Sequence, residues 1–135
     1  MTTVQRVAQI FGVVFILVAL AGFYTGGMDM NADPATAPAI FEMFPVNLLH
    51  NIVHLLFGIW GLAAARAYTS AKQYAQIAGI IYLVLAVVGY FVPDGFGLVP
   101  LGGNDVWLHL VLGVILAGAG FTAKPATVAP TGSTI

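Results

Sequence analysis

The chain contains no cysteine and very few charged residues. Without cysteine, disulfides, thiolate zinc sites and iron–sulfur clusters are excluded. Only 7% of the 135 residues are charged and 60% are hydrophobic, and a soluble fold of this size could not bury that much apolar surface. The formal net charge of -1 provides no basic surface for nucleic acid. These deficits indicate a small integral membrane protein.

Four apolar segments are each about as long as the roughly 20 residues that an α-helix needs to cross a bilayer. They cover residues 7–24, 46–65, 74–92 and 106–123. The sequence therefore predicts an all-α fold, a four-helix bundle in a single membrane domain over residues 1–124. The Pro-, Thr- and Ala-rich residues 125–135 are predicted to be a flexible tail. In the loop 25–45, Asp33 and Pro34 could begin a short interfacial helix, and an irregular loop is an equally good interpretation.

The third apolar segment nearly repeats the first. The stretch "AQIFGVVFILVALAGF" at residues 8–23 aligns with "AQIAGIIYLVLAVVGY" at residues 75–90. The second and fourth segments share a weaker His-x-x-x-Gly match, through His54 and His109. We therefore expect a duplicated two-helix hairpin whose halves enter the membrane from the same side.

Basic and acidic residues separate between alternate connections. The amino terminus, the second connection and the carboxyl tail hold all the basic residues, which are Arg6, Arg66, Lys72 and Lys124. The first and third connections hold all the acidic residues, which are Asp29, Asp33, Glu42, Asp94 and Asp105. The positive-inside rule then predicts that both termini are cytoplasmic and that the acidic loops lie outside.

Polar and small residues share one face of each predicted helix. On the second helix this face carries Asn47, His50, Asn51, His54, Gly58 and Gly61. The other three helices contribute Gly12, Gly22, Gly79, Tyr82, Gly89, Asp105, His109 and Gly113. Small residues allow membrane helices to approach closely, so we expect the four faces to meet and to bury the histidines in the outer half of the bundle.

Three stretches, "VNLLHNIVHLLFGIWGLAAAR", "GIIYLVLAVVGY" and "GGNDVWLHLVLGVIL", resemble a widespread family of small four-span bacterial membrane proteins, a domain of unknown function. The resemblance covers most of the chain and implies the four-helix fold, but no chemistry. Its pattern comprises Asn47, His50, His54, Asp105, His109 and Gly113. We expect the chain in a bacterial cytoplasmic, intracytoplasmic or thylakoid membrane.

Several interpretations of the polar face are open. In the one we favour, no cofactor is bound and the polar side chains form a hydrogen-bonded network that fixes the pairing of the hairpins. Its members would be Asn47, His50, Asn51, His54, Tyr82, Asp105 and His109. Alternatively, His54 and His109, with His50 as a further candidate, bind haem b or chlorophyll.

A metal site and a proton path complete the alternatives. His50 and His54 lie at i, i+4, and His109 with Asp105 or Glu42 could complete a zinc or copper site. Histidine inside a membrane is also a candidate for a proton or ion path.

Enzyme activity is not expected, because no nucleophile stands beside a base, no glycine-rich phosphate loop is present and no carboxylate pair lies in the membrane segments. We expect a non-enzymatic accessory, assembly or stabilising subunit. Its partners would be the lipid bilayer and a larger membrane complex or a second copy of the chain, with no nucleic acid.

Overall fold

The structure is a computed structural model that describes residues 1–128 and 132, and over these residues the chain forms four α-helices. The helices are α1 (Thr3–Gly26), α2 (Leu48–Ala64), α3 (Tyr68–Phe91) and α4 (Asn104–Thr122). Helices α1, α3 and α4 are long and apolar enough to cross a membrane, and α2 is a shorter apolar helix of 17 residues. The structure thus confirms the predicted all-helical fold, with three helices that can span a membrane and a fourth, shorter apolar helix. The predicted tail lies partly outside the described residues, at 129–131 and 133–135.

Polar residues at the helix ends explain why the helices differ from the predicted segments by a few residues. Helix α1 begins at Thr3 because the Thr2 hydroxyl accepts from the Gln5 amide at 3.4 Å, while the Gln5 side chain accepts from the Thr2 amide at 2.9 Å. Helix α2 begins only at Leu48, because Asn47 is extended and caps it. Helix α3 begins at Tyr68, ahead of the apolar stretch, with a polar first turn. Hydropathy alone does not detect such ends.

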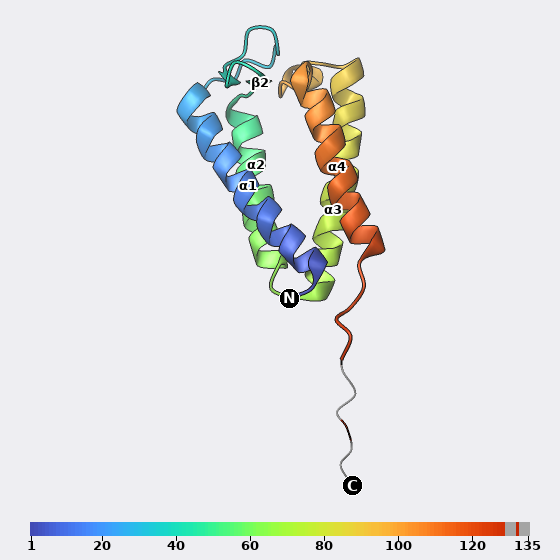
Figure 1. The fold of residues 1–135 in the computed structure, drawn as a ribbon. Helices are drawn as coiled ribbons and strands as arrows, with labels where there is room; N and C mark the ends of the chain where they lie inside the picture. Colours follow the sequence, from blue (N-terminus) through green and yellow to red (C-terminus); the bar gives the residue numbers. More distant parts are fainter. Residues whose placement is uncertain (129–131, 133–135) are drawn as a thin grey trace.

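The four helices form two antiparallel hairpins, α1 with α2 and α3 with α4 (Figure 1). In Figure 1 the hairpins lie close together near the chain's N-terminus and separate toward the opposite end, where the long loops lie. The connection between α2 and α3 is short and lies at the N-terminal end of the molecule.

Within the first hairpin, glycines bring the two backbones into contact. A Cβ atom on Gly12 would lie 2.8 Å from the Leu62 amide nitrogen, and one on Gly58 would lie 2.9 Å from the Ile16 amide nitrogen. No side chain fits at either position without moving a helix.

The second hairpin has the same kind of contact. A Cβ atom on Gly79 would meet the backbone of Ala117, and one on Gly113 would lie 2.8 Å from the Leu83 amide nitrogen. The remaining glycines of the predicted faces also lie in close contacts: Gly22 against the Asn51 side chain, Gly61 against Tyr74, and Gly89 against the Leu101 carbonyl.

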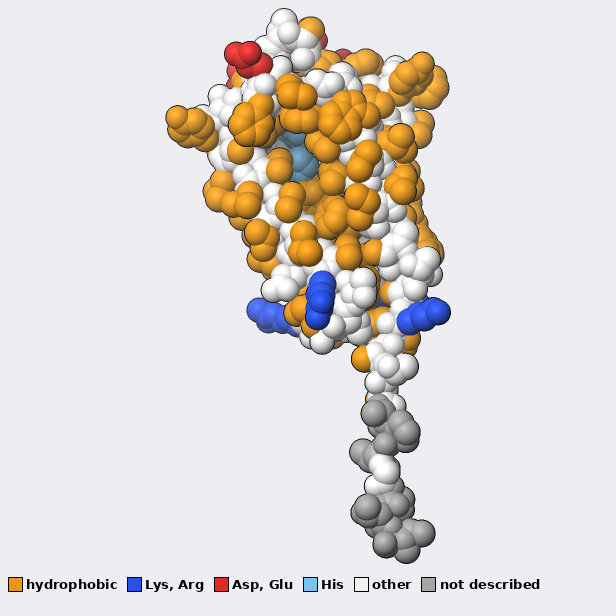
Figure 2. All heavy atoms as spheres, in the orientation of Figure 1, with side chains coloured by type: hydrophobic (Ala, Val, Ile, Leu, Met, Phe, Trp, Pro, Cys, Tyr) orange, Lys and Arg blue, Asp and Glu red, His pale blue; other side chains and the backbone are white. Residues whose placement is uncertain are grey.

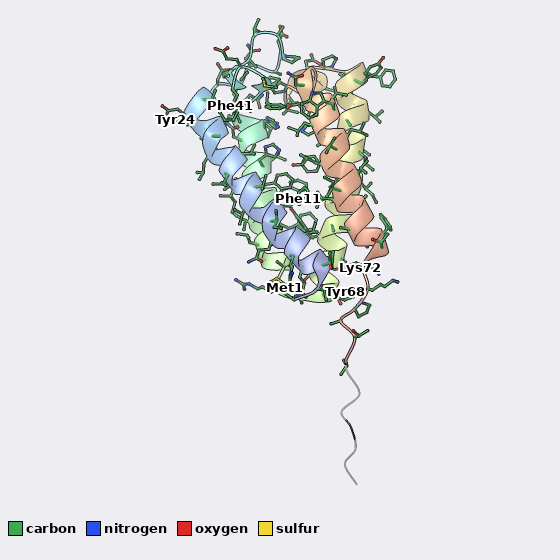
Figure 3. All side chains as sticks on the ribbon, in the orientation of Figure 1. Met1, Phe11, Tyr24, Phe41, Tyr68 and Lys72 are labelled. Atoms are coloured by element: carbon green, nitrogen blue, oxygen red, sulfur yellow. The ribbon has the colours of Figure 1, made fainter. Side chains whose placement is uncertain are left out.

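Aromatic rings fill the space between the two hairpins. Phe15 of α1 stacks on Tyr82 of α3, with ring centroids 5.2 Å apart and 9° between the planes. Phe15 also stacks on His54 of α2, at 5.5 Å and 6°. Phe11 and Tyr74 are buried in the same core, and Figure 3 shows Phe11 between the hairpins. This aromatic layer lies between the histidines and the end of the bundle where the chain begins.

For residues 25–45 the sequence left a short interfacial helix and an irregular loop open, and the structure has no helix there. The Asp33 carboxylate accepts from the Ala35 amide at 2.9 Å, and the Asp33 carbonyl accepts from Ala37 at 2.8 Å, which makes a single turn. Pro38 follows and provides no amide for a second turn. The chain then forms a short antiparallel ladder of β1 (Ala39–Ile40) and β2 (Phe44–Pro45).

The residues between β1 and β2 make a tight turn. Phe41 and Glu42 both have positive φ, at 52° and 58°, and Phe41 is 85% exposed. In the third connection, the 3₁₀ helix η1 (Gly95–Gly97) leads toward α4.

Charged and apolar side chains separate along the long axis of the molecule. Figure 2 shows Lys and Arg side chains at the N-terminal end, Asp and Glu side chains at the opposite end, and hydrophobic side chains between them. Large exposed apolar residues occur on all four helices. This is the surface of helices that contact a lipid bilayer.

Candidate functional site

The three histidines of the chain meet in the half of the bundle that faces the long loops. His50 and His54 lie one turn apart on α2, and His109 lies on α4. One ring nitrogen from each histidine lies within 4.8 Å of the other two. The ring centroids of His50 and His54 are 4.4 Å apart, and those of His50 and His109 are 6.2 Å apart. We call these three residues the His cluster.

The His cluster is deeply buried. His50 and His54 are each 5% exposed and His109 is 1% exposed. Their positions follow from helical spacing, since i and i+4 lie on one face and the glycine contacts turn that face of α2 inward.

Asn47 fixes where α2 begins and therefore where the His cluster lies along it. Its side-chain oxygen accepts from the His50 amide at 2.9 Å, and its side-chain nitrogen donates to the Leu98 carbonyl at 2.9 Å. Asn47 was predicted to join the polar network. Its side chain instead bonds to backbone groups, and it ties α2 to the third connection.

Many polar atoms around the His cluster have no hydrogen-bond partner among the described residues. They are both ring nitrogens of His50, Nδ1 of His54, Nδ1 of His109, Oδ2 of Asp105 and both amide atoms of Asn51. The side chains predicted to form a network are therefore neighbours without hydrogen bonds between them. An unpartnered buried polar atom costs about 1–3 kcal/mol, so this concentration of them needs an explanation.

Asp105 lies one turn before His109 on α4 and is 1% exposed. The residue at the N-cap of α4 is Gly103, so Asp105 does not cap its helix. The structure also gives it no hydrogen bond to His109 among the described residues. Its carboxylate is not one of the three converging ligand atoms, although it lines the same cavity as the His cluster.

Of two other candidate site residues, Tyr82 lies next to the His cluster and Glu42 lies away from it. Tyr82 lies directly beside the His cluster, with its ring centroid 5.3 Å from that of His109. Glu42, which was considered as a metal ligand, is exposed in the turn between β1 and β2 and does not belong to the His cluster.

A cavity of about 210 Å³ adjoins the His cluster. Its walls come from Val14, Phe15 and Val18 of α1, from Ile40, Phe41 and Phe44 near the β1–β2 ladder, and from Leu108 and Leu112 of α4. Its polar residues are the three histidines and Asp105. In Figure 2 a histidine is visible from outside between hydrophobic side chains, so this cavity opens on the apolar surface. We call it the lateral cavity.

Sequence reasoning identified the four polar residues of the lateral cavity but not its walls. The aromatic residues near the β1–β2 ladder come from a loop for which an interfacial helix was considered. No periodic pattern in so short a ladder indicates which side chains turn toward the helices.

A family model described as "Domain of unknown function (DUF4383)" matches residues 5–122. The match includes the whole His cluster and nearly all of the four helices. No curated protein and no solved structure matches the chain. The chain belongs to this family of unknown function, as the sequence motifs predicted.

Proposed function

We propose that this member of the family is an integral membrane protein that binds one transition-metal ion through His50, His54 and His109. The convergence of three buried imidazole nitrogens within 4.8 Å carries the assignment. Zinc–nitrogen bonds of about 2.0–2.1 Å in a tetrahedral site place ligand nitrogens about 3.3 Å apart. Side-chain rotations that move the nitrogens by about 1 Å would bring the histidines to that geometry.

The chemistry of the site suits such an ion. Neutral imidazole is a good ligand for zinc and copper, and coordination would give a partner to ring nitrogens that now have none. A divalent ion in an apolar interior also needs a nearby negative charge. The Asp105 carboxylate, in the same cavity, can supply it.

A haem b or chlorophyll ring on His54 and His109 is less well supported. The lateral cavity, at about 210 Å³, is smaller than the roughly 300–1,000 Å³ of pockets that hold drug-sized ligands. Phe15 and Tyr82 already occupy the space beside His54. A proton path is disfavoured for a similar reason, since stacked aromatic rings fill the interior between the His cluster and the N-terminal end.

We also infer that all four helices span the membrane and that both termini are cytoplasmic. The 17 residues of α2 are at the lower limit for a span, which is about 17–25 residues. The separation of basic and acidic side chains in Figure 2 supports the orientation. The His cluster then lies in the outer half of the bilayer.

A gene duplication of one hairpin is supported by equivalent contacts. Gly12 packs on Leu62 as Gly79 packs on Ala117. In the same way, Gly58 packs on Ile16 as Gly113 packs on Leu83. These pairs agree with the sequence alignment of the two halves. We assign the protein a binding function and no catalytic step, and an accessory role in a larger complex stays a prediction.

The test is zinc binding by the purified protein in mild detergent, measured as zinc content after removal of free ion. We expect one zinc per chain and a higher melting temperature with zinc than after chelation. His54→Gln and His109→Gln keep hydrogen-bonding capacity but lose a ligand, so both should lose the zinc and the zinc-dependent shift. Tyr82→Phe, which keeps the ring beside the His cluster, is the matched control and should bind zinc normally.

The network interpretation makes the opposite prediction. If the wild-type protein takes up no zinc, or if the two glutamine variants retain it, the metal assignment is wrong.

A further inference from the structure

The lateral cavity is open toward lipid rather than toward water. Val14 on one wall is 41% exposed, and it belongs to the apolar surface of α1. The opposite wall comes from α4, and residues of the β1–β2 ladder and turn complete the lining. A ligand that reaches the His cluster by this opening must therefore dissolve in the bilayer.

The size of the lateral cavity restricts the ligand further. An apolar cavity of about 150 Å³ is enough to hold benzene. The lateral cavity, at about 210 Å³, therefore holds one aromatic ring with small substituents. Phe15, Phe41 and Phe44 line it, and aromatic side chains pack favourably on a ring.

The polar residues of the lateral cavity define the chemistry of the ring. Asp105 is 1% exposed, and its Oδ2 atom has no hydrogen-bond partner among the described residues. Beside a bound metal cation the Asp105 carboxylate is ionised, and an ionised carboxylate only accepts hydrogen bonds. With a metal ion on the imidazole nitrogens, this oxygen is the acceptor left for a ligand, so the ligand must donate.

The geometry points to a lipid-soluble phenol or quinol: a hydroxylated ring enters the lateral cavity from the bilayer, its hydroxyl donates to Asp105, and its tail stays among the lipids. The ligand class rests on the proposed function, because the metal ion occupies the histidine nitrogens and keeps Asp105 an acceptor. Asp105 lines the same cavity as the histidines, and its Oδ2 atom is the polar atom there that a hydroxyl can satisfy. A lipid acyl chain would also fill the apolar part, but it would leave Asp105 without a partner.

The test uses the full-length protein in phosphatidylcholine nanodiscs. The probes are a benzoquinol with a decyl tail, kept reduced, and its dimethyl ether, which has no hydroxyl to donate. Trp107 reports binding, because its ring centroid lies 5.8 Å from that of Phe44 on the cavity wall. Trp60→Phe removes the other tryptophan of the chain.

We expect saturable binding of the quinol, and binding of the ether that is weaker by about tenfold or more, because a hydrogen bond to a charged group is lost. Asp105→Leu should reduce quinol binding to the level of the ether. Val18→Phe fills the lateral cavity and should weaken both probes about tenfold or more. The matched control Val84→Phe adds the same ring to the exposed surface of α3, where Val84 is 54% exposed, and should change nothing.

Two results would overturn the assignment. Equal binding of quinol and ether would mean that the cavity accepts apolar material without using Asp105. Unchanged quinol binding in Val18→Phe would mean that the probe binds elsewhere. Zinc content is measured on the same samples, and quinol binding is repeated after chelation, so a failure of the ring site is distinguished from a failure of the metal site.

Discussion

Replacing Gly113 by alanine should destabilise the protein, whereas the same change at Gly118 on the same helix should not. A Cβ atom at Gly113 would lie 2.8 Å from the Leu83 amide nitrogen and 2.8 Å from Leu83 Cγ. At Gly118 nothing lies within 4 Å of an added Cβ atom. The two sites thus differ in close packing while sharing residue type, helix and chemical change.

The expected difference in unfolding free energy can be worked from two contributions. Both variants gain about 1 kcal/mol of helix propensity over glycine, and this gain cancels in the comparison. Only Gly113→Ala also forces α3 and α4 apart, and overpacking typically costs about 1–3 kcal/mol. Gly113→Ala should therefore be less stable than Gly118→Ala by about 1–3 kcal/mol.

Denaturant unfolding in mild detergent, followed by far-ultraviolet circular dichroism, measures this difference. Equal stability of the two variants would refute the conclusion that backbone contact at Gly113 holds α3 and α4 together. Greater stability of Gly113→Ala would refute it as well.

Two further predictions concern topology and the outer loops. Thr36 and Thr69 are both exposed, and each can be replaced by a single cysteine. In intact cells an impermeant thiol reagent should label Thr36→Cys and not Thr69→Cys. Labelling at position 69 would contradict the proposed orientation. Asn47→Ala removes the cap of α2 and the bond to the Leu98 carbonyl, so thermal unfolding should show a loss of about 1–2 kcal/mol. Asn47→Ser keeps a side-chain oxygen that can cap α2 and should lose less, and equal losses would show that the cap contributes nothing.

Periodicity carried most of the prediction of the fold, because membrane helices must satisfy their backbone hydrogen bonds internally and so appear as long apolar segments. The burial of His50, His54 and His109 followed from the face that they share with glycines. The ends of the helices were predicted less well. They depend on caps such as Thr2 and Asn47, which are polar and lie outside the apolar windows.

The sequence predicted which residues are buried, but it did not predict which side chains bond to one another. Hydrogen bonds among Asn47, Asn51 and the histidines were expected because buried polar groups usually pair. The structure instead directs Asn47 to the backbone and places Asn51 against Gly22. Which partner a side chain reaches depends on helix rotation of a few tens of degrees, and a helical wheel does not resolve that.

The proposed duplication clarifies why the site has three nitrogens and one carboxylate. Aligning the two halves pairs His54 with His109, and it pairs His50 with Asp105. Two copies of the first hairpin would present four neutral imidazoles and no charge to balance a divalent ion in the membrane interior. Two copies of the second would bring two carboxylates together, whose mutual repulsion in a low dielectric would be costly. One copy of each yields three neutral ligands with a single counter-charge beside them. Divergence of the two halves at this one position therefore accounts both for the proposed metal site and for the acceptor that remains for a hydroxylated ring.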